Sequence, residues 1–143
     1  MSGGGAGGTA APSYASVTEF ESAGQIVETA MDSFGRLDIL CNAAGILRDR
    51  MVFNMSREEW DDVIAVHLKG HYNLVHRAAR IMREQRSGRI VTFSSTSGLY
   101  GNFGQTNYGA AKDGIAGLTR VVARDLGQYV IPCNGITPAP PTP

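Results

Sequence analysis

A tyrosine and a lysine four positions apart could transfer a proton to or from a substrate. Tyr108 and Lys112 lie in a stretch whose apolar spacing predicts a helix, so both side chains would project from one face, one turn apart. A free tyrosine titrates at about pH 10, which is too high for a base at neutral pH. A neighbouring ammonium group favours the ionised phenol. The same spacing also occurs on solvated helix faces, so the interpretation depends on what surrounds the pair.

Two segments rich in small and polar residues follow predicted strands. Ser95 comes after the apolar run 90–93, and 42–45 (Asn-Ala-Ala-Gly) comes after the apolar run 37–41. In open α/β sheets ligands bind at the carboxyl ends of the strands, and small residues let a ligand approach the backbone closely. We therefore expect Ser95 to hydrogen-bond a substrate oxygen beside Tyr108.

The elements that must position these residues alternate along the chain. Apolar spacing, capping signals and Gly or Pro breaks predict helices at 18–34, 56–78 and 105–128 and strands at 37–41, 90–93 and 129–136. Capping boxes at 18–21 and 56–59 would begin the first two helices, Gly35 would end the first, and 94–104 would be a loop. Gly70 weakens the second helix locally. The alternation predicts a doubly wound parallel sheet, with helices on both faces and strands buried on both sides.

Composition narrows the class of protein. We divide the 143 residues into a flexible Gly/Ala-rich segment at 1–15, one domain at 16–138 and a Pro-rich tail at 139–143. The 13 Lys and Arg balance 13 Asp and Glu, which disfavours a nucleic-acid or membrane-surface partner. No apolar run approaches the roughly 18 residues that span a bilayer, so we expect a cytoplasmic protein. Cys41 and Cys133 lack metal-binding spacing and are expected to be small buried residues.

Four motifs, in this order, resemble the short-chain dehydrogenase/reductase family. They are the Asn-Ala-Ala-Gly segment 42–45, the Ser95…Tyr108-x-x-x-Lys112 set, the loop 101–108 and the segment 134–138 (Asn-Gly-Ile-Thr-Pro). The resemblance implies a Rossmann-like fold over 16–138 and an oxidoreductase that uses NAD or NADP. Segments 45–50 and 101–108 are especially similar to the (3R)-hydroxyacyl-CoA dehydrogenase part of type-2 multifunctional enzymes and to bacterial relatives. A 3-hydroxyacyl thioester or a similar small-molecule substrate is implied.

The resemblance also implies a role for each matching residue. Tyr108 would exchange a proton with the substrate hydroxyl or carbonyl, and Lys112 would support it and hold the nicotinamide ribose. Ser95 would orient the substrate carbonyl and stabilise charge on its oxygen. The residues implied to line the cofactor are Asn42, Ala43, Ala44, Gly45, Tyr108, Lys112, Ile136 and Pro138. No metal site is implied.

His67 departs from the family, which usually has asparagine at this position. An imidazole both donates and accepts hydrogen bonds, so His67 could act in the same proton relay, with simple packing as an equal alternative. The hydroxyacyl-CoA branch resembles this chain here, which favours a native variation. His71 and His76 are expected on the helix surface or at an interface.

The chain departs more strongly from the family at its two ends. The letters Gly-x-Gly-x-x-Gly occur at 3–8, but only two residues precede them and Pro12 follows, so we do not expect a phosphate-binding turn. The family continues past 134–138 into a substrate loop, whereas this chain becomes Pro-rich. Pro132 in the last strand indicates an edge. We therefore expect a truncated domain that alone binds dinucleotide poorly and turns over little. Micromolar binding in isothermal titration would contradict this.

A catalytically weak interaction module is the alternative function. In the family, helices matching 57–83 and 105–127 form subunit contacts, which implies a homo-oligomer. The same helices could dock on a full-length partner. The sequence leaves open the choice between NAD and NADP, the substrate, the oligomer size and whether the natural protein contains further residues.

Overall fold

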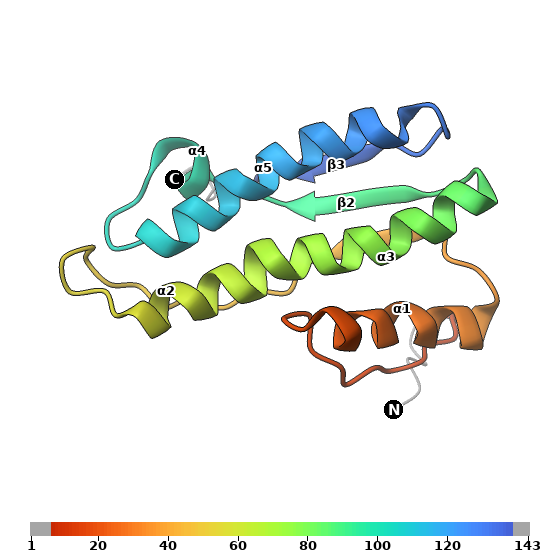
Figure 1. Ribbon diagram of the computed structural model, residues 1–143, viewed down its shortest axis with the longest axis horizontal. Coiled ribbons are helices and arrows are strands. Elements are labelled where there is room, and N and C mark those ends of the chain that lie inside the picture. Colours follow the sequence, from red (N-terminus) through yellow and green to blue (C-terminus); the bar gives the residue numbers. More distant parts are fainter. Residues whose placement is uncertain (1–6, 139–143) are drawn as a thin grey trace.

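The computed structural model describes residues 7–138. Its elements are α1 (Phe20–Phe34), β1 (Ile39–Asn42), α2 (Arg57–Ile64), the π-helical turn η1 (Ala65–Lys69), α3 (Gly70–Gln85), β2 (Arg89–Phe93), α4 (Thr96–Tyr100), α5 (Thr106–Gly127) and β3 (Cys133–Ile136) (Figure 1). Residues 7–15 form no helix or strand, as expected for the Gly/Ala-rich segment. The rest of that segment, the first part of the Gly-x-Gly-x-x-Gly letters and the Pro-rich tail lie outside the described residues.

The three strands form one parallel sheet in the order β1–β2–β3. The parallel, Rossmann-like arrangement is confirmed, with helices as the crossovers between strands. Cys41 and Cys133 lie on strands separated by β2, and both are free. Cys133 is buried as predicted, but Cys41 is exposed, so the prediction of burial is wrong for that residue.

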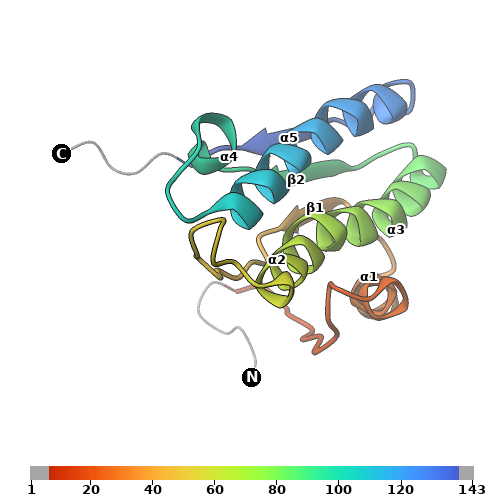
Figure 2. The ribbon, with the colours of Figure 1, turned by 60° about the vertical axis from the view of Figure 1, so that its left-hand side comes forward.

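One face of the sheet is covered and the other is open within residues 7–138. Leu40, Ile90 and Cys133 lie in register on the covered face, where they join a core with side chains from α1, α3 and α5. The three helices lie side by side with α3 in the middle (Figures 1 and 2). On the opposite face Ile39 is 63% exposed and Cys41 is also exposed.

Within residues 7–138 the helices cover one face of the sheet, so these residues do not include the second helical layer or the burial of the strands on their other face. The physical reason lies in the strand order. Right-handed crossovers that step in one direction, from β1 to β2 to β3, place their helices on the same side of the sheet. Helices on both faces require a reversal of that direction, which these three strands do not contain.

The start of α1 differs from the predicted capping box. The Thr18 hydroxyl shares a hydrogen bond with Ser16 Oγ (2.9 Å), and the N-cap is Glu19, which makes no side-chain cap bond. Asn73 of α3 donates to the Thr18 carbonyl (3.3 Å) and so draws this segment toward α3. Gly35 ends the helix with φ 74°, the left-handed conformation predicted for it.

The second capping box is confirmed, but the helix that it begins is not continuous. Ser56 Oγ accepts from the Glu59 N–H, and the Glu59 carboxylate accepts from the Ser56 N–H. The wider turn η1 then separates α2 from α3. Gly70 begins α3, and a Cβ there would lie 2.9 Å from Val17 Cγ2. This glycine therefore permits close packing of the segment before α1.

Two segments near the carboxyl end differ from prediction. The expected loop 94–104 contains the short helix α4, and β3 begins at Cys133 rather than at Tyr129. Val130 has φ 62°, so the chain turns before the strand. Pro132 precedes β3, and its carbonyl accepts from the Ile90 N–H (3.0 Å). A proline at this edge position removes no ladder donor from the sheet interior.

Candidate functional site

A cleft of about 450 Å³ opens at the carboxyl ends of the strands. Its volume lies within the range of small-molecule sites. Six of the residues singled out in the sequence line it, namely Ala43, Gly45, His67, Tyr108, Lys112 and Pro138. They come from the loop after β1, from η1, from α5 and from the segment after β3. This is the edge of a parallel sheet at which ligands bind.

Tyr108 and Lys112 face this cleft from adjacent turns of α5. Lys112 Nζ lies 5.4 Å from the centre of the Tyr108 ring, close enough for its charge to act on the phenol. Lys112 is only 5% exposed, and burial lowers the pKa of its ammonium group. The pair is therefore not part of a solvated helix face.

The end of β2 fixes the position of Lys112. Lys112 Nζ donates to the Phe93 carbonyl (2.7 Å), and the Ser94 hydroxyl donates to the Lys112 carbonyl (2.9 Å). Phe93 and Ser94 also line the cleft. The sequence analysis did not single them out, although their place directly before Ser95 at a strand end was an available signal.

His67, in η1, packs against the ring of Tyr108. Its ring is 3% exposed and meets the Tyr108 ring edge-on, with centroids 5.0 Å apart. His67 Nε2 lies 2.8 Å from the Ile46 carbonyl oxygen and 3.1 Å from the Ile46 backbone nitrogen, so it can donate to the first or accept from the second, whereas Nδ1 is buried without a partner among the described residues. Burial lowers the pKa of His67. The imidazole is therefore neutral near pH 7 and retains one nitrogen for a further hydrogen bond.

Gly45 makes room for that ring. A Cβ at Gly45 would lie 2.6 Å from His67 Cε1, a distance that real side chains do not show. The glycine expected to let a ligand approach thus also lets a side chain approach. Gly45 and His67 are therefore in close contact, and both line the cleft.

Asn107 holds the start of α5 in place and was missed by the sequence analysis. It is fully buried, and its Nδ2 donates to the carbonyls of Arg48 (3.0 Å) and Glu59 (2.9 Å). Its Oδ1 accepts from the Tyr108 N–H (2.7 Å). Asn107 therefore ties the loop after β1 and helix α2 to the start of α5, directly before Tyr108. No periodicity in the sequence signals a buried amide.

Ser95 does not line the cleft. Its hydroxyl accepts from the Ser97 N–H (3.1 Å) and so caps α4. This cap explains why a helix forms where a loop was expected. A hydroxyl that accepts one hydrogen bond keeps its own proton to donate. The predicted contact of Ser95 with a substrate oxygen stays a prediction.

Asn42, Ala44 and Ile136 also lie outside the cleft lining. Asn42 Oδ1 accepts from the Ala44 N–H (3.2 Å), which shapes the loop after β1. The Ile136 carbonyl accepts from a backbone N–H at the end of β2 (2.9 Å) and holds β3 in place. Their cofactor contacts stay predictions.

The residues of the cleft fit the nicotinamide end of a dinucleotide. Ala43 and Gly45 line the cleft with little or no side chain, and Lys112 supplies an ammonium donor. Asn42, which precedes Ala43 and does not itself line the cleft, has a buried Nδ2 without a partner among the described residues. The pyrophosphate end has no matching element between residues 7 and 138, because α1 is the first element there and no strand with a glycine turn precedes it.

No helix between residues 7 and 138 is long and apolar enough to cross a membrane. Across that range, no three or more His, Cys, Asp and Glu side chains are grouped so that they could hold a metal ion.

Comparison with known proteins identifies the family. A family model described as short chain dehydrogenase matches residues 4–141. The chain is 50% identical over 133 residues to peroxisomal multifunctional enzyme A of Dictyostelium discoideum, covering 93% of this chain and 30% of that protein. It is 45% identical over 141 residues to a hydroxyacyl-CoA dehydrogenase of Mycobacterium tuberculosis, covering 93% of this chain and 44% of that protein.

A solved structure gives the same result. A short chain dehydrogenase from Mycobacterium avium matches with a TM-score of 0.88 and 47% identity, over 93% of this chain and 49% of that chain. The fold and the cleft define a Rossmann-like α/β protein with a cleft at the strand ends. The chain belongs to the short-chain dehydrogenase family, a family of oxidoreductases. It spans less than half the length of each of these three relatives.

Proposed function

We propose that this chain interconverts a secondary alcohol and a ketone with NAD or NADP, and that Tyr108 is the acid/base. One observation carries the proposal: Tyr108, Lys112 and Gly45 line the same cleft, and Lys112 Nζ lies 5.4 Å from the centre of the Tyr108 ring. Membership of an oxidoreductase family supports the reaction class.

Each residue has a defined part in this reaction. The nicotinamide, when bound, accepts or supplies the hydride. Tyr108, beside the Lys112 ammonium, takes the proton from the substrate hydroxyl during oxidation and returns it during reduction. Lys112 also holds the nicotinamide ribose, while the free hydroxyl proton of Ser95 orients the substrate oxygen. His67 Nδ1, which has no partner among the described residues, makes a hydrogen bond in the proton path.

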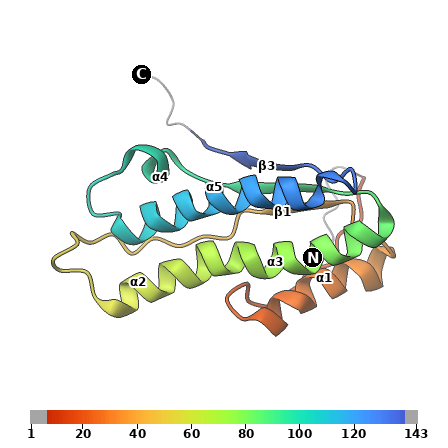
Figure 3. The ribbon, with the colours of Figure 1, turned by 45° about the horizontal axis from the view of Figure 1, so that its top comes forward.

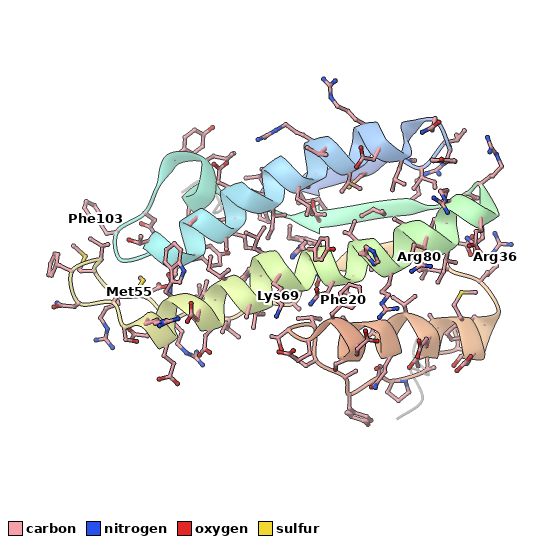
Figure 4. The ribbon with its side chains drawn as sticks, viewed as in Figure 1. Phe20, Arg36, Met55, Lys69, Arg80 and Phe103 are labelled. Atoms are coloured by element: carbon pink, nitrogen blue, oxygen red, sulfur yellow. The ribbon has the colours of Figure 1, made fainter. Side chains whose placement is uncertain are left out.

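The substrate that we propose is a 3-hydroxyacyl thioester. Two loops and the short helix α4 near the cleft expose apolar side chains: Leu47 (55%), Phe53 (77%) and Phe103 (91%) on the loops, and Leu99 (46%) on α4. The Arg50 N–H donates to the Gly104 carbonyl (2.7 Å), so the loops meet at one end of the molecule, where Phe103 also lies (Figures 3 and 4). An exposed apolar rim suits an alkyl chain. The name of the Mycobacterium tuberculosis relative supports the same substrate class.

Replacing Tyr108 with phenylalanine tests the proposal, because it keeps the ring and removes the transferable proton. With a 3-hydroxyacyl thioester and NAD or NADP, we expect turnover to fall at least about 100-fold, followed by the absorbance of the reduced nicotinamide. Tyr14→Phe is the matched control, since Tyr14 is 97% exposed and lies outside the cleft. Equal turnover in Tyr108→Phe and the parent would contradict the role. A folded parent without any turnover would favour the interaction module.

We also propose that the chain forms a homo-oligomer through α3 and α5. A groove of about 240 Å³ runs between these helices and is lined by Tyr72, Leu118 and Val122. Tyr72 and Val121 are 49% and 58% exposed, so the pair of helices presents apolar surface that a second copy would cover. A cytoplasmic location stays a prediction, because several relatives carry the word peroxisomal in their names.

A further inference from the structure

We infer that His71 is a positioning residue that fixes Lys112 and His67 relative to one another. His71 was expected on the helix surface or at an interface, and this is wrong, because its side chain is 0% exposed within the chain. The inference concerns the machinery of the proposed function and rests on it. His71 itself lines no part of the cleft.

The hydrogen bonds of the imidazole define its orientation and its tautomer. His71 Nδ1 lies 2.6 Å from the His67 carbonyl oxygen. Because a carbonyl oxygen only accepts, Nδ1 must carry the proton. His71 Nε2 is then without a proton, and it accepts from the Phe93 N–H at 3.4 Å. Burial lowers the pKa of His71 to about 4, so the ring is neutral near pH 7.

The two bonds connect the two sides of the cleft. One reaches the backbone of His67, whose ring packs on Tyr108. The other reaches the Phe93 peptide, whose carbonyl accepts from Lys112 Nζ (2.7 Å). The buried ring of His71 thus links η1, which carries His67, to the end of β2, which holds Lys112. His67 and Lys112 both contact the ring of Tyr108. A ring that only filled space would need no particular tautomer.

The parent chain provides a test that needs no substitution. The chain has three histidines, so their ring nitrogens can be assigned by long-range ¹⁵N–¹H correlation spectra. At pH 7 we expect a proton on Nδ1 of His71 and none on Nε2. A proton on Nε2 would break the connection to Phe93 and overturn the inference.

Two variants separate the role from simple packing. His71→Phe keeps a ring and removes both bonds, and His71→Asn keeps a donor near Nδ1 and loses the acceptor. We expect the Phe93 amide, which the β1–β2 register also directs toward β1, to exchange with solvent measurably faster in both variants. We expect kcat to fall about tenfold or more in His71→Phe and less in His71→Asn, with the KM for the thioester nearly unchanged. His76→Phe is the control, because His76 lies on the same helix and packs on Phe20 and Tyr72, away from the cleft.

The outcomes distinguish this inference from the proposed function. Unchanged Phe93 exchange, or an equal loss of kcat in His76→Phe, overturns the role of His71 even if the parent is active. A parent without turnover defeats the proposed function. In that case the tautomer of His71 and the hydrogen exchange of the Phe93 amide still decide whether His71 links His67 to Phe93.

Discussion

The buried imidazole of His71 makes the stability of the chain depend on pH. Its pKa is lowered to about 4, against 6.5 for an exposed histidine. Between these values the unfolded chain binds a proton that the folded chain does not. The contribution is therefore complete above pH 6.5 and is lost as the pH falls toward 4. The shift corresponds to about 3 kcal/mol. The pKa of His67 is lowered in the same direction and adds to the effect.

Urea unfolding at pH 7 and at pH 4.5 measures this dependence. Between the two pH values we expect the free energy of unfolding of the parent to fall by about 2–3 kcal/mol more than that of His71→Phe. The comparison cancels carboxylates common to both chains, such as Asp38 and Glu59. Equal losses in the two chains would show that the ring is not held neutral in the folded state.

Within residues 7–138, Val130 is the β-branched residue whose backbone has a positive φ. It has φ 62° and is 69% exposed, and a branched side chain in this left-handed region costs about 1–2 kcal/mol. We expect Val130→Gly to raise the free energy of unfolding by about 1 kcal/mol, because relief of strain exceeds the added chain entropy.

The same substitution at Val121 is a matched control for Val130→Gly. Val121 is 58% exposed within α5, where glycine should lower stability by about 0.5 kcal/mol. Thermal unfolding of the two variants gives both signs in one experiment. A lower melting temperature for Val130→Gly than for the parent would rule out strain at this turn.

At the scale of the elements, periodicity predicted α5 well and β3 less well. The apolar positions of α5 repeat over many turns, so its predicted span of 105–128 is close to the observed Thr106–Gly127. The run 129–136 is also apolar, but the left-handed turn at Val130 leaves only Cys133–Ile136 as strand. Spacing therefore identifies a long element more reliably than it identifies the end of a short one.

The residues of the site also differ in whether the sequence could predict them. Tyr108, Lys112 and Gly45 could be singled out because their spacing and their place after strands carry the signal. Asn107 and His71 could not, because their importance comes from burial between elements distant in the sequence. The face of the sheet that each helix covers could not be predicted either, because strand order has no local signature in the sequence.

The paired helices α3 and α5 yield a prediction about association. A glutamate at Val122 would place a charge in the apolar groove between them, so we expect Val122→Glu to shift the chain toward the monomer. Light scattering coupled to size exclusion measures this mass. Val52→Glu is the control, because Val52 is 64% exposed on a loop away from these helices. A monomeric parent, or equal masses in parent and Val122→Glu, would argue against this interface.

For the molecule as a whole, the two cysteines report on the two faces of the sheet. Cys41 is exposed on the open face, whereas Cys133 is buried on the covered face and burial raises the pKa of its thiol to about 11. We expect a thiol reagent at pH 7.5 to modify Cys41 within minutes and Cys133 only after unfolding. Peptide mass mapping identifies the modified site, with Cys41→Ser as the control. Equal modification rates at Cys41 and Cys133 would show that the two faces of the sheet are equally accessible to the reagent.

The open sheet face also affects how the chain responds to temperature. Unfolding releases apolar surface mainly from one side of the strands, so the heat-capacity increment and the denaturant slope should both be small for a chain of this length. A small increment flattens the curve of stability against temperature. Such a chain gives up little stability on cooling, and its thermal transition is broad rather than steep.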